Sequence, residues 1–326
     1  MSCSLSLLTK KDVSITIGKC DYCRIKRAKN LIDDLMKIER LFRVYVASLR
    51  EFEAYLLLSS LDSAIGWNDK SETMDDLYDS VFCNNVDVNY RVLSVLTAAG
   101  AYHDQRKAWL KGKEYREEIE KVFSIEYDKK LSYRIIEILR NHAKHQDLPI
   151  GNILYDSSNK YQHPRPEGAS RLREAIEPRV VISELIKNGR LKSATRTEVG
   201  NIDKGYICLK SLLRNYAASM ARGHEKVRQQ TSDALTAAKN EIDAAHHRFQ
   251  QEFPGEEKRS EYFLGATTTD VHGEEEVHVG KVFYRRLDRA RAQFQGLESF
   301  ERFYVSSEMI DNPETYYCDV GEVLRD

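Results

Sequence analysis

The segment Arg140–His145 brings a permanent cation, an amide and an imidazole together within six residues. An arginine guanidinium can bind two phosphate oxygens at once, and it keeps its charge at any physiological pH. A histidine near neutral pH can give or accept a proton, and the C-terminal end of a helix favours its protonated form. From these residue types we predict a site that transfers protons at a phosphodiester. Arg140 would bind the phosphate, and His145 would exchange protons with the reacting groups.

Cleavage of RNA by its own 2′-hydroxyl needs these groups and no metal ion. DNA is inert in this reaction because it lacks the 2′-hydroxyl. Asn141 precedes His145 by four residues, so both lie on one face of a helix, where the amide could orient the imidazole. The segment favours a metal-independent endoribonuclease that uses no cofactor, with Arg140, Asn141 and His145 as catalytic residues.

Three further residues are candidates for substrate binding: His142, Lys144 and His103. His103 stands near the end of a predicted helix, and an antiparallel bundle would bring that end close to the motif. His142 and His145 have the i, i+3 spacing of helical metal ligands, but no carboxylate motif joins them. We therefore predict no metal site at these residues.

The six cysteines are too few and too scattered for a disulfide scaffold. Cys20 and Cys23 form a single CxxC motif, which supplies only two of the four ligands of a structural zinc site. Reduced thiols near a turn are the favoured interpretation. A zinc site completed by Cys3 or by a distant histidine is the alternative.

The motif and its surroundings resemble a known family. The spacing of the arginine and the histidine, with a polar residue directly after the arginine, is similar to the R-x4–6-H motif of the HEPN superfamily. The helical domains of this superfamily include many metal-independent ribonucleases. In this chain the motif reads Arg140-Asn141-His142-Ala143-Lys144-His145, followed by Gln146-Asp147-Leu148-Pro149-Ile150. The preceding helix, around Asn89–Leu96, is similar in character to the corresponding helix of uncharacterised bacterial proteins of this kind. The resemblance covers about residues 30 to 150 and, less closely, the long helix after residue 200.

The resemblance implies that Arg140, Asn141 and His145 act on an RNA substrate in a cleft shared by two chains of a homodimer. It also implies a place in bacterial toxin–antitoxin or antiviral defence, with an antitoxin or another defence protein as partner. A toxin subgroup carries a tyrosine two positions after the histidine, where this chain has Asp147. Regulation by nucleotidylation at that position is therefore not expected. The alternative function is a non-catalytic helical module that binds a nucleotide or a partner protein.

Apolar periodicity predicts a mainly α-helical protein, an antiparallel bundle with a short N-terminal strand and a small C-terminal β-hairpin plus helix. The expected helices span about residues 28–65, 86–102, 109–123, 128–145, 202–249 and 285–303. The strand is expected at 13–18, a loop at about 66–85, and the hairpin around residues 270–274. Pro149 should end the fourth helix, and Gly223 is a candidate kink in the fifth.

Net charge is −1, which argues against constitutive tight binding of nucleic acid. The charge is uneven, because residues 252–326 carry 17 acidic and 9 basic residues, so residues 1–251 carry a net +7. We therefore expect a HEPN-like helical domain over 1–251, with an irregular insertion at about 150–200, and a small acidic α+β element over 252–326. No apolar run is long enough to cross a membrane, which predicts a cytoplasmic protein.

Overall fold

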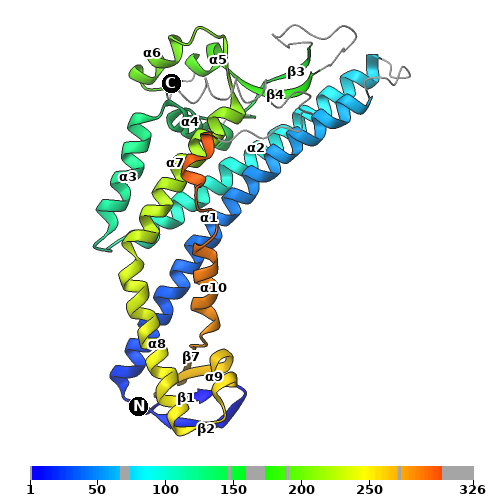
Figure 1. The fold of residues 1–326 in the computed structure, drawn as a ribbon. Helices are drawn as coiled ribbons and strands as arrows, with labels where there is room; N and C mark the ends of the chain where they lie inside the picture. Colours follow the sequence, from blue (N-terminus) through cyan, green and yellow to red (C-terminus); the bar gives the residue numbers. More distant parts are fainter. Residues whose placement is uncertain are drawn as a thin grey trace, which may run out of the picture.

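A computed structural model describes residues 2–66, 74–145, 148–158, 173–187, 189, 191–270 and 273–302. The molecule is elongated, with a helical body and a small antiparallel sheet toward each end (Figure 1). The predicted fold class, a mainly α-helical bundle with an N-terminal strand and a C-terminal hairpin plus helix, is confirmed.

The longest helix, α1 (Lys19–Gly66), runs through most of the molecule beside α2 (Met74–Leu110) and α8 (Ser232–Glu252). Its apolar stripe, including Phe42, Tyr45 and Phe52, is buried in the main core. The prediction of a loop up to about residue 85 is wrong, because the backbone is already helical at residue 74. Asp, Ser and Asn cost only fractions of a kcal/mol each in a helix, and pairing with α1 outweighs that cost.

Three helices complete the upper bundle: α3 (Arg116–Lys129), α4 (Leu131–His145) and α7 (Leu209–Gln230). The predicted kink at Gly223 is wrong, since Gly223 lies inside α7 and the break falls at Thr231, between α7 and α8. A Cβ atom on Gly223 would stand 2.2 Å from the Phe123 ring. The glycine therefore permits close packing of α7 on α3.

At the lower end, four strands form an antiparallel sheet in the order β2-β1-β6-β7. They are β1 (Ser2–Leu7), β2 (Lys10–Thr16), β6 (Leu264–Asp270) and β7 (Gly273–His278), and α9 (Glu257–Phe263) precedes β6. The predicted N-terminal strand and C-terminal hairpin are present, and β1 is an additional strand. Because Leu5 of β1 pairs with Ala266 of β6, two segments that lie far apart in the sequence share one sheet and one apolar core.

The stretch expected to be irregular, about residues 150–200, contains β3 (Asn152–Ser158) and β4 (Arg173–Val181) of a second antiparallel sheet. Its third strand, β5 (Tyr206–Cys208), lies where a helix was predicted from residue 202, and that helix begins only at Leu209. Two short helices follow β4, namely α5 (Ile182–Lys187) and α6 (Ser193–Gly200). Apolar residues of β4, Ile176 and Val180, join the main core. Burial of these residues gives order to a segment whose sequence carries little periodicity.

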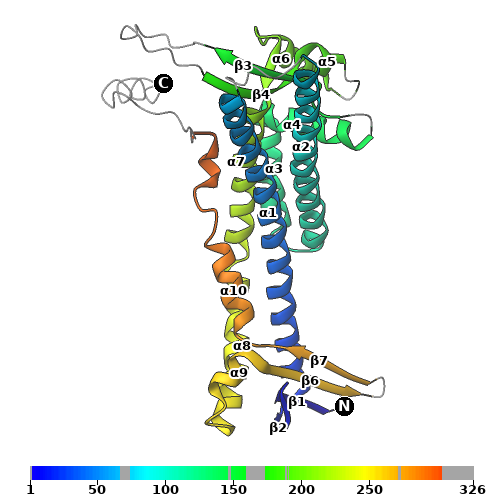
Figure 2. The same cartoon turned by 90° about the vertical axis from the view of Figure 1, so that its right-hand side faces the viewer.

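The helix expected at 285–303 is divided into α10 (Val282–Arg291) and a 3₁₀ helix, η1 (Leu297–Arg302). Between them Phe294 and Gly296 have positive φ angles of 61° and 86°, which a continuous helix cannot contain. Figures 1 and 2 both show α10 alongside α1. Within the described ranges, no helix is both long enough and apolar enough to traverse a bilayer.

Candidate functional site

A pocket of about 450 Å³ opens between α2, α3 and α4. Its wall contains three cations, one histidine, two tyrosines and three carboxylates: Arg106, Lys107, Arg140, His103, Tyr127, Tyr133, Asp104, Glu120 and Glu137. Phe123 and Ser124 complete the lining. This is where the structure places Arg140, the first residue of the motif.

Arg140 reaches the pocket by lying across Gly100 of α2, where a Cβ atom would come within 3.4 Å of its Cδ. Its guanidinium forms an ion pair with Glu137 one turn earlier on α4, with 2.8 Å between Nη2 and Oε2. The side chain keeps a quarter of its surface exposed. Because a guanidinium has five N–H donors, Glu137 fixes the orientation of Arg140 while leaving donors for a bound anion.

His103 lies behind Arg140 and is buried. Its Nε2 is 3.0 Å from the Tyr133 hydroxyl, 3.2 Å from the Tyr216 hydroxyl and 3.8 Å from Glu137 Oε1. Burial, together with the positive charges of Arg106 and Arg140, holds the pKa of His103 well below its usual value. The imidazole is therefore neutral at pH 7 and can accept a hydrogen bond from Tyr133.

Arg106 is fully buried, three residues after His103 on α2. Its Nη2 donates to Glu120 at 3.1 Å, and its guanidinium carbon lies 3.4 Å from the centre of the Phe123 ring. Its Nε and Nη1 are buried and find no acceptor in the described part of the chain. The buried guanidinium adds positive charge behind the pocket wall, and this charge favours an anion in the pocket.

The remaining motif residues lie elsewhere on α4. Asn141 and His142 are half-buried and Lys144 is exposed, and none of the three is among the described residues that line the pocket. His145 is the last residue of α4, and its side chain falls outside the described part. Five residues along a helix separate the directions of Arg140 and His145 by about 140°.

The pocket contains residues that the sequence analysis missed, among them Arg106, Lys107 and Tyr133. Arg106 and Lys107 follow His103 by three and four residues, so a helix places them on the face that carries His103. This spacing in the sequence could have identified Arg106 and Lys107 as neighbours of His103. Tyr133 and Tyr216 belong to separate helices, and only their packing shows that both reach His103.

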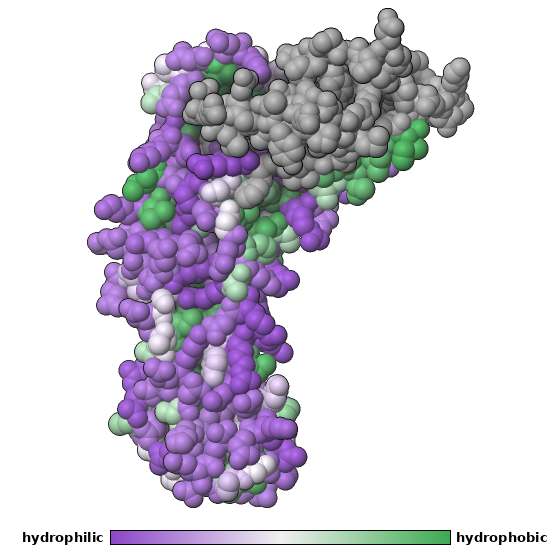
Figure 3. Space-filling model, viewed as in Figure 1, coloured by the Kyte–Doolittle hydropathy of each residue, from purple (hydrophilic) through white to green (hydrophobic). Residues whose placement is uncertain are grey.

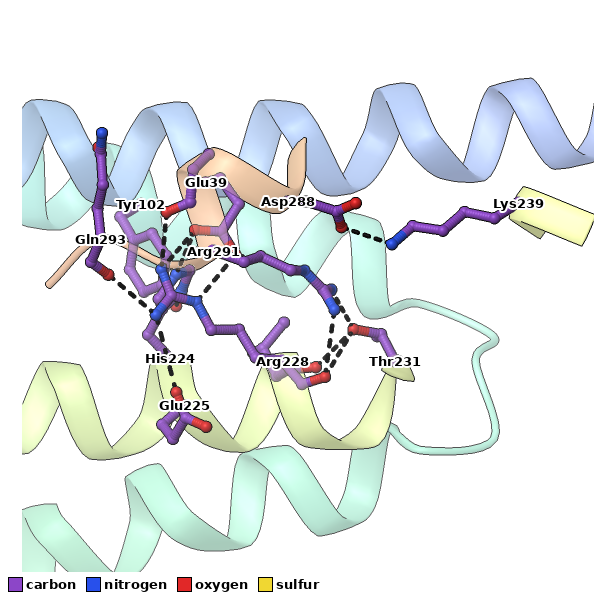
Figure 4. A network of polar contacts seen from close by, with 12 residues as sticks. Glu39, Tyr102, His224, Glu225, Arg228, Thr231, Lys239, Asp288, Arg291 and Gln293 are labelled. Atoms are coloured by element: carbon purple, nitrogen blue, oxygen red, sulfur yellow. Dashed lines mark hydrogen bonds and ion pairs between the residues drawn. The ribbon is translucent and has the colours of Figure 1, made fainter. Parts of the chain in front are cut away.

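A second polar cluster is buried where α1, α2, α7 and α10 meet (Figure 4). Glu39 accepts hydrogen bonds from His224 at 3.1 Å and from Arg228 at 2.8 Å, and Arg291 lies 3.7 Å away. Burial alone would raise the pKa of Glu39, but its bonds to His224 and Arg228 outweigh burial and lower the pKa to about 2. Burial lowers the pKa of His224, whose Nδ1 accepts from Tyr102 at 2.9 Å.

The described residues contain no group of three or more histidine, cysteine or acidic side chains placed to hold a metal ion. Cys20 and Cys23 lie at the start of α1 as free thiols. Searches of family models, of curated proteins and of solved structures give no match to this chain. A functional assignment therefore depends on the geometry of the pocket and on the motif beside it.

Proposed function

We propose that this protein is a metal-independent endoribonuclease of HEPN type, with Arg140 binding the scissile phosphate. The observation that supports this most strongly is the shared pocket of Arg140 and Arg106. One guanidinium is partly exposed and oriented by Glu137, and the other is buried with two donors unused among the described residues. Arg140 and Lys107 can offer the charge-assisted hydrogen bonds that a phosphodiester requires, and the buried charge of Arg106 adds to the attraction for the phosphate.

The proposed reaction needs two kinds of group: the cations that bind the phosphate and a side chain that transfers protons. In the proposal, His145 takes the proton of the ribose 2′-hydroxyl as that oxygen forms a bond to phosphorus. The bond from phosphorus to the 5′-oxygen then breaks, the leaving oxygen takes a proton from water, and His145 afterwards returns its proton to solvent. The products are a 2′,3′-cyclic phosphate and a 5′-hydroxyl. Arg140 stabilises the charge that develops on the phosphorane oxygens, and Asn141 orients the imidazole.

A homodimer is part of the proposal, because Arg140 and His145 leave α4 in different directions. Two chains that meet at the motif would let the Arg140 pocket of one chain face the His145 end of the other. The arm formed by α1 and α2 carries exposed apolar residues at helical spacing: Leu57, Leu61, Ile65, Phe82, Val86 and Tyr90. Figure 3 shows hydrophobic surface along this arm. Apolar patches of this kind often mark protein interfaces.

The test is cleavage of a labelled single-stranded RNA by the full chain in the presence of EDTA. We expect 2′,3′-cyclic phosphate ends from the wild type and a loss of about 100-fold or more in His145→Ala and Arg140→Gln. Arg50→Gln is the matched control, because Arg50 is a largely exposed arginine on α1, remote from the pocket. Intact RNA, or equal cleavage by all four proteins, would reject the proposal.

A further inference from the structure

A second basic pocket, of about 350 Å³, lies between α1 and α10. Four arginines line it, Arg40 and Arg43 on α1 and Arg286 and Arg289 on α10. The other lining residues include Glu39, Met36 and Phe294. It shares no lining residue with the pocket at Arg140, so it is a separate site.

The four arginines are not neutralised by neighbours. All four are exposed, and among the described residues none of them forms an ion pair or a side-chain hydrogen bond. Each helix also presents its two arginines at i, i+3, an arrangement in which like charges repel. The nearest acid on α10, Asp288, instead pairs with Lys239 at 2.5 Å (Figure 4).

Glu39 is the only acidic residue in the described lining of this pocket, and its charge is already balanced by Arg228 and Arg291. It is buried beneath the pocket, where it binds His224, Arg228 and, at a longer distance, Arg291. Beneath the pocket, Arg228 and Arg291 therefore share the single carboxylate of Glu39. The four arginines that line the pocket lie above these three residues. The net charge of the site is strongly positive.

The pocket also has an apolar wall. Phe294 lines it and packs edge-on against Phe42, with ring centres 6.3 Å apart. Its φ angle of 61° lies in the left-handed region, which non-glycine residues seldom adopt and which clusters at ligand sites. An aromatic ring beside four guanidinium groups suits an anion attached to a flat group.

We propose that this pocket binds a ligand with adjacent, anhydride-linked phosphates: a nucleoside triphosphate or an inorganic oligophosphate. The four arginines line one pocket from two neighbouring helices, which fits concentrated negative charge. A single RNA strand carries only one charge per nucleotide and would be followed by a stripe of basic residues. The inference does not depend on the ribonuclease activity proposed above, because it uses other residues and another face.

The test measures binding of ATP and of tripolyphosphate to the full chain by calorimetry and by thermal shift, without added metal. We expect both probes to bind and to raise the melting temperature with concentration. Tighter binding of ATP identifies a nucleotide ligand, and tighter binding of tripolyphosphate identifies an inorganic one. The double variant Arg43→Gln/Arg289→Gln should weaken binding about 100-fold, because each lost arginine–phosphate contact costs about tenfold.

Arg50→Gln removes an exposed arginine from α1 outside the pocket and should bind both probes as the wild type does. The pocket arginines are exposed and have no partner in the described chain, so the double variant is expected to fold, which its circular dichroism checks. Three outcomes overturn the proposal: no binding of either probe, equal affinity in the double variant, or competition by a uridine decamer as strong as that of tripolyphosphate.

Discussion

Two clusters in this molecule combine the same four residue types, and they differ in how far their charged groups are exposed to solvent. Glu39 is joined to His224, Arg228 and, through the histidine, Tyr102. Glu137 is joined to Arg140 and Tyr216, and His103 lies 3.8 Å from it. The Glu39 side chain is 5% exposed and that of Glu137 is 18% exposed.

The two carboxylates differ in whether they bind the histidine directly and in how far their arginine partner is exposed. Glu39 binds the imidazole directly, and the cluster joins helices α1, α2 and α7 at their crossing. Glu137 lacks a direct bond to His103 and holds an arginine that still faces a pocket. We conclude that the first cluster fixes the fold, whereas the second positions groups for a ligand.

The largest expected effect separates the two carboxylates. Glu39→Gln removes the buried countercharge of Arg228 and Arg291, leaves among the described residues only the half-exposed Glu225 at 3.7 Å from Arg228, and should lower the free energy of unfolding by about 3–5 kcal/mol. Glu137→Gln should cost about 1 kcal/mol, because Arg140 can turn toward water. Urea denaturation of both variants measures the difference. Equal losses would mean that the clusters play the same role.

The second prediction tests whether the exposed cluster serves chemistry instead of stability. Arg140→Gln should reduce RNA cleavage about 100-fold, which corresponds to about 2.7 kcal/mol of transition-state stabilisation. Its free energy of unfolding should change by about 1 kcal/mol or less, since the Arg140 side chain is partly exposed. A variant that loses activity only in proportion to its loss of folded protein would contradict this separation.

The third prediction concerns pH. Burial lowers the pKa of His103, His224 and His246 below 6.5, and that of His246 to about 4. The unfolded chain therefore binds more protons than the folded chain below about pH 6.5, so acid favours unfolding. Stability should fall by up to about 1.4 kcal/mol per pH unit for each histidine.

Urea midpoints at pH 7, 6 and 5 check this decline. For His246 the loss should continue until about pH 4, and Glu39 should add a further loss as the pH falls from about 4.5 toward 2. A constant midpoint between pH 7 and pH 5 would show that these histidines are not held neutral.

The smallest expected effect compares the two tyrosines. Tyr216→Phe removes a hydroxyl that donates to Glu137 at 2.7 Å and contacts His103, and should cost about 1–2 kcal/mol. Tyr102→Phe removes one hydrogen bond, to His224, and should cost about 1 kcal/mol. Thermal melts of both variants measure the order, and a larger loss for Tyr102→Phe would show that its single bond to His224 contributes more to stability than the two contacts of the Tyr216 hydroxyl.

The sequence alone predicted most of the helices, because the spacing of residues such as Phe42, Tyr45 and Phe52 on α1 is visible without coordinates. It did not predict β1, because β6, the strand that pairs along the whole length of β1, lies far away in the sequence. Of the candidate site, it predicted Arg140 and the proximity of His103. It could not predict Arg106 as a buried pocket residue, since that depends on the packing of Phe123 and Glu120 from α3.

The pairing of β1 with β6 has a consequence for how the protein is made. Cys3 and Thr268 touch across the sheet although 265 positions separate them. A ribosome makes β1 well before β6, so the hairpin of β1 and β2 lacks its third strand while the helices between them are synthesised. Contacts over such long separations close slowly, and until β6 arrives the unpaired edge of β1 is open to pairing with other chains.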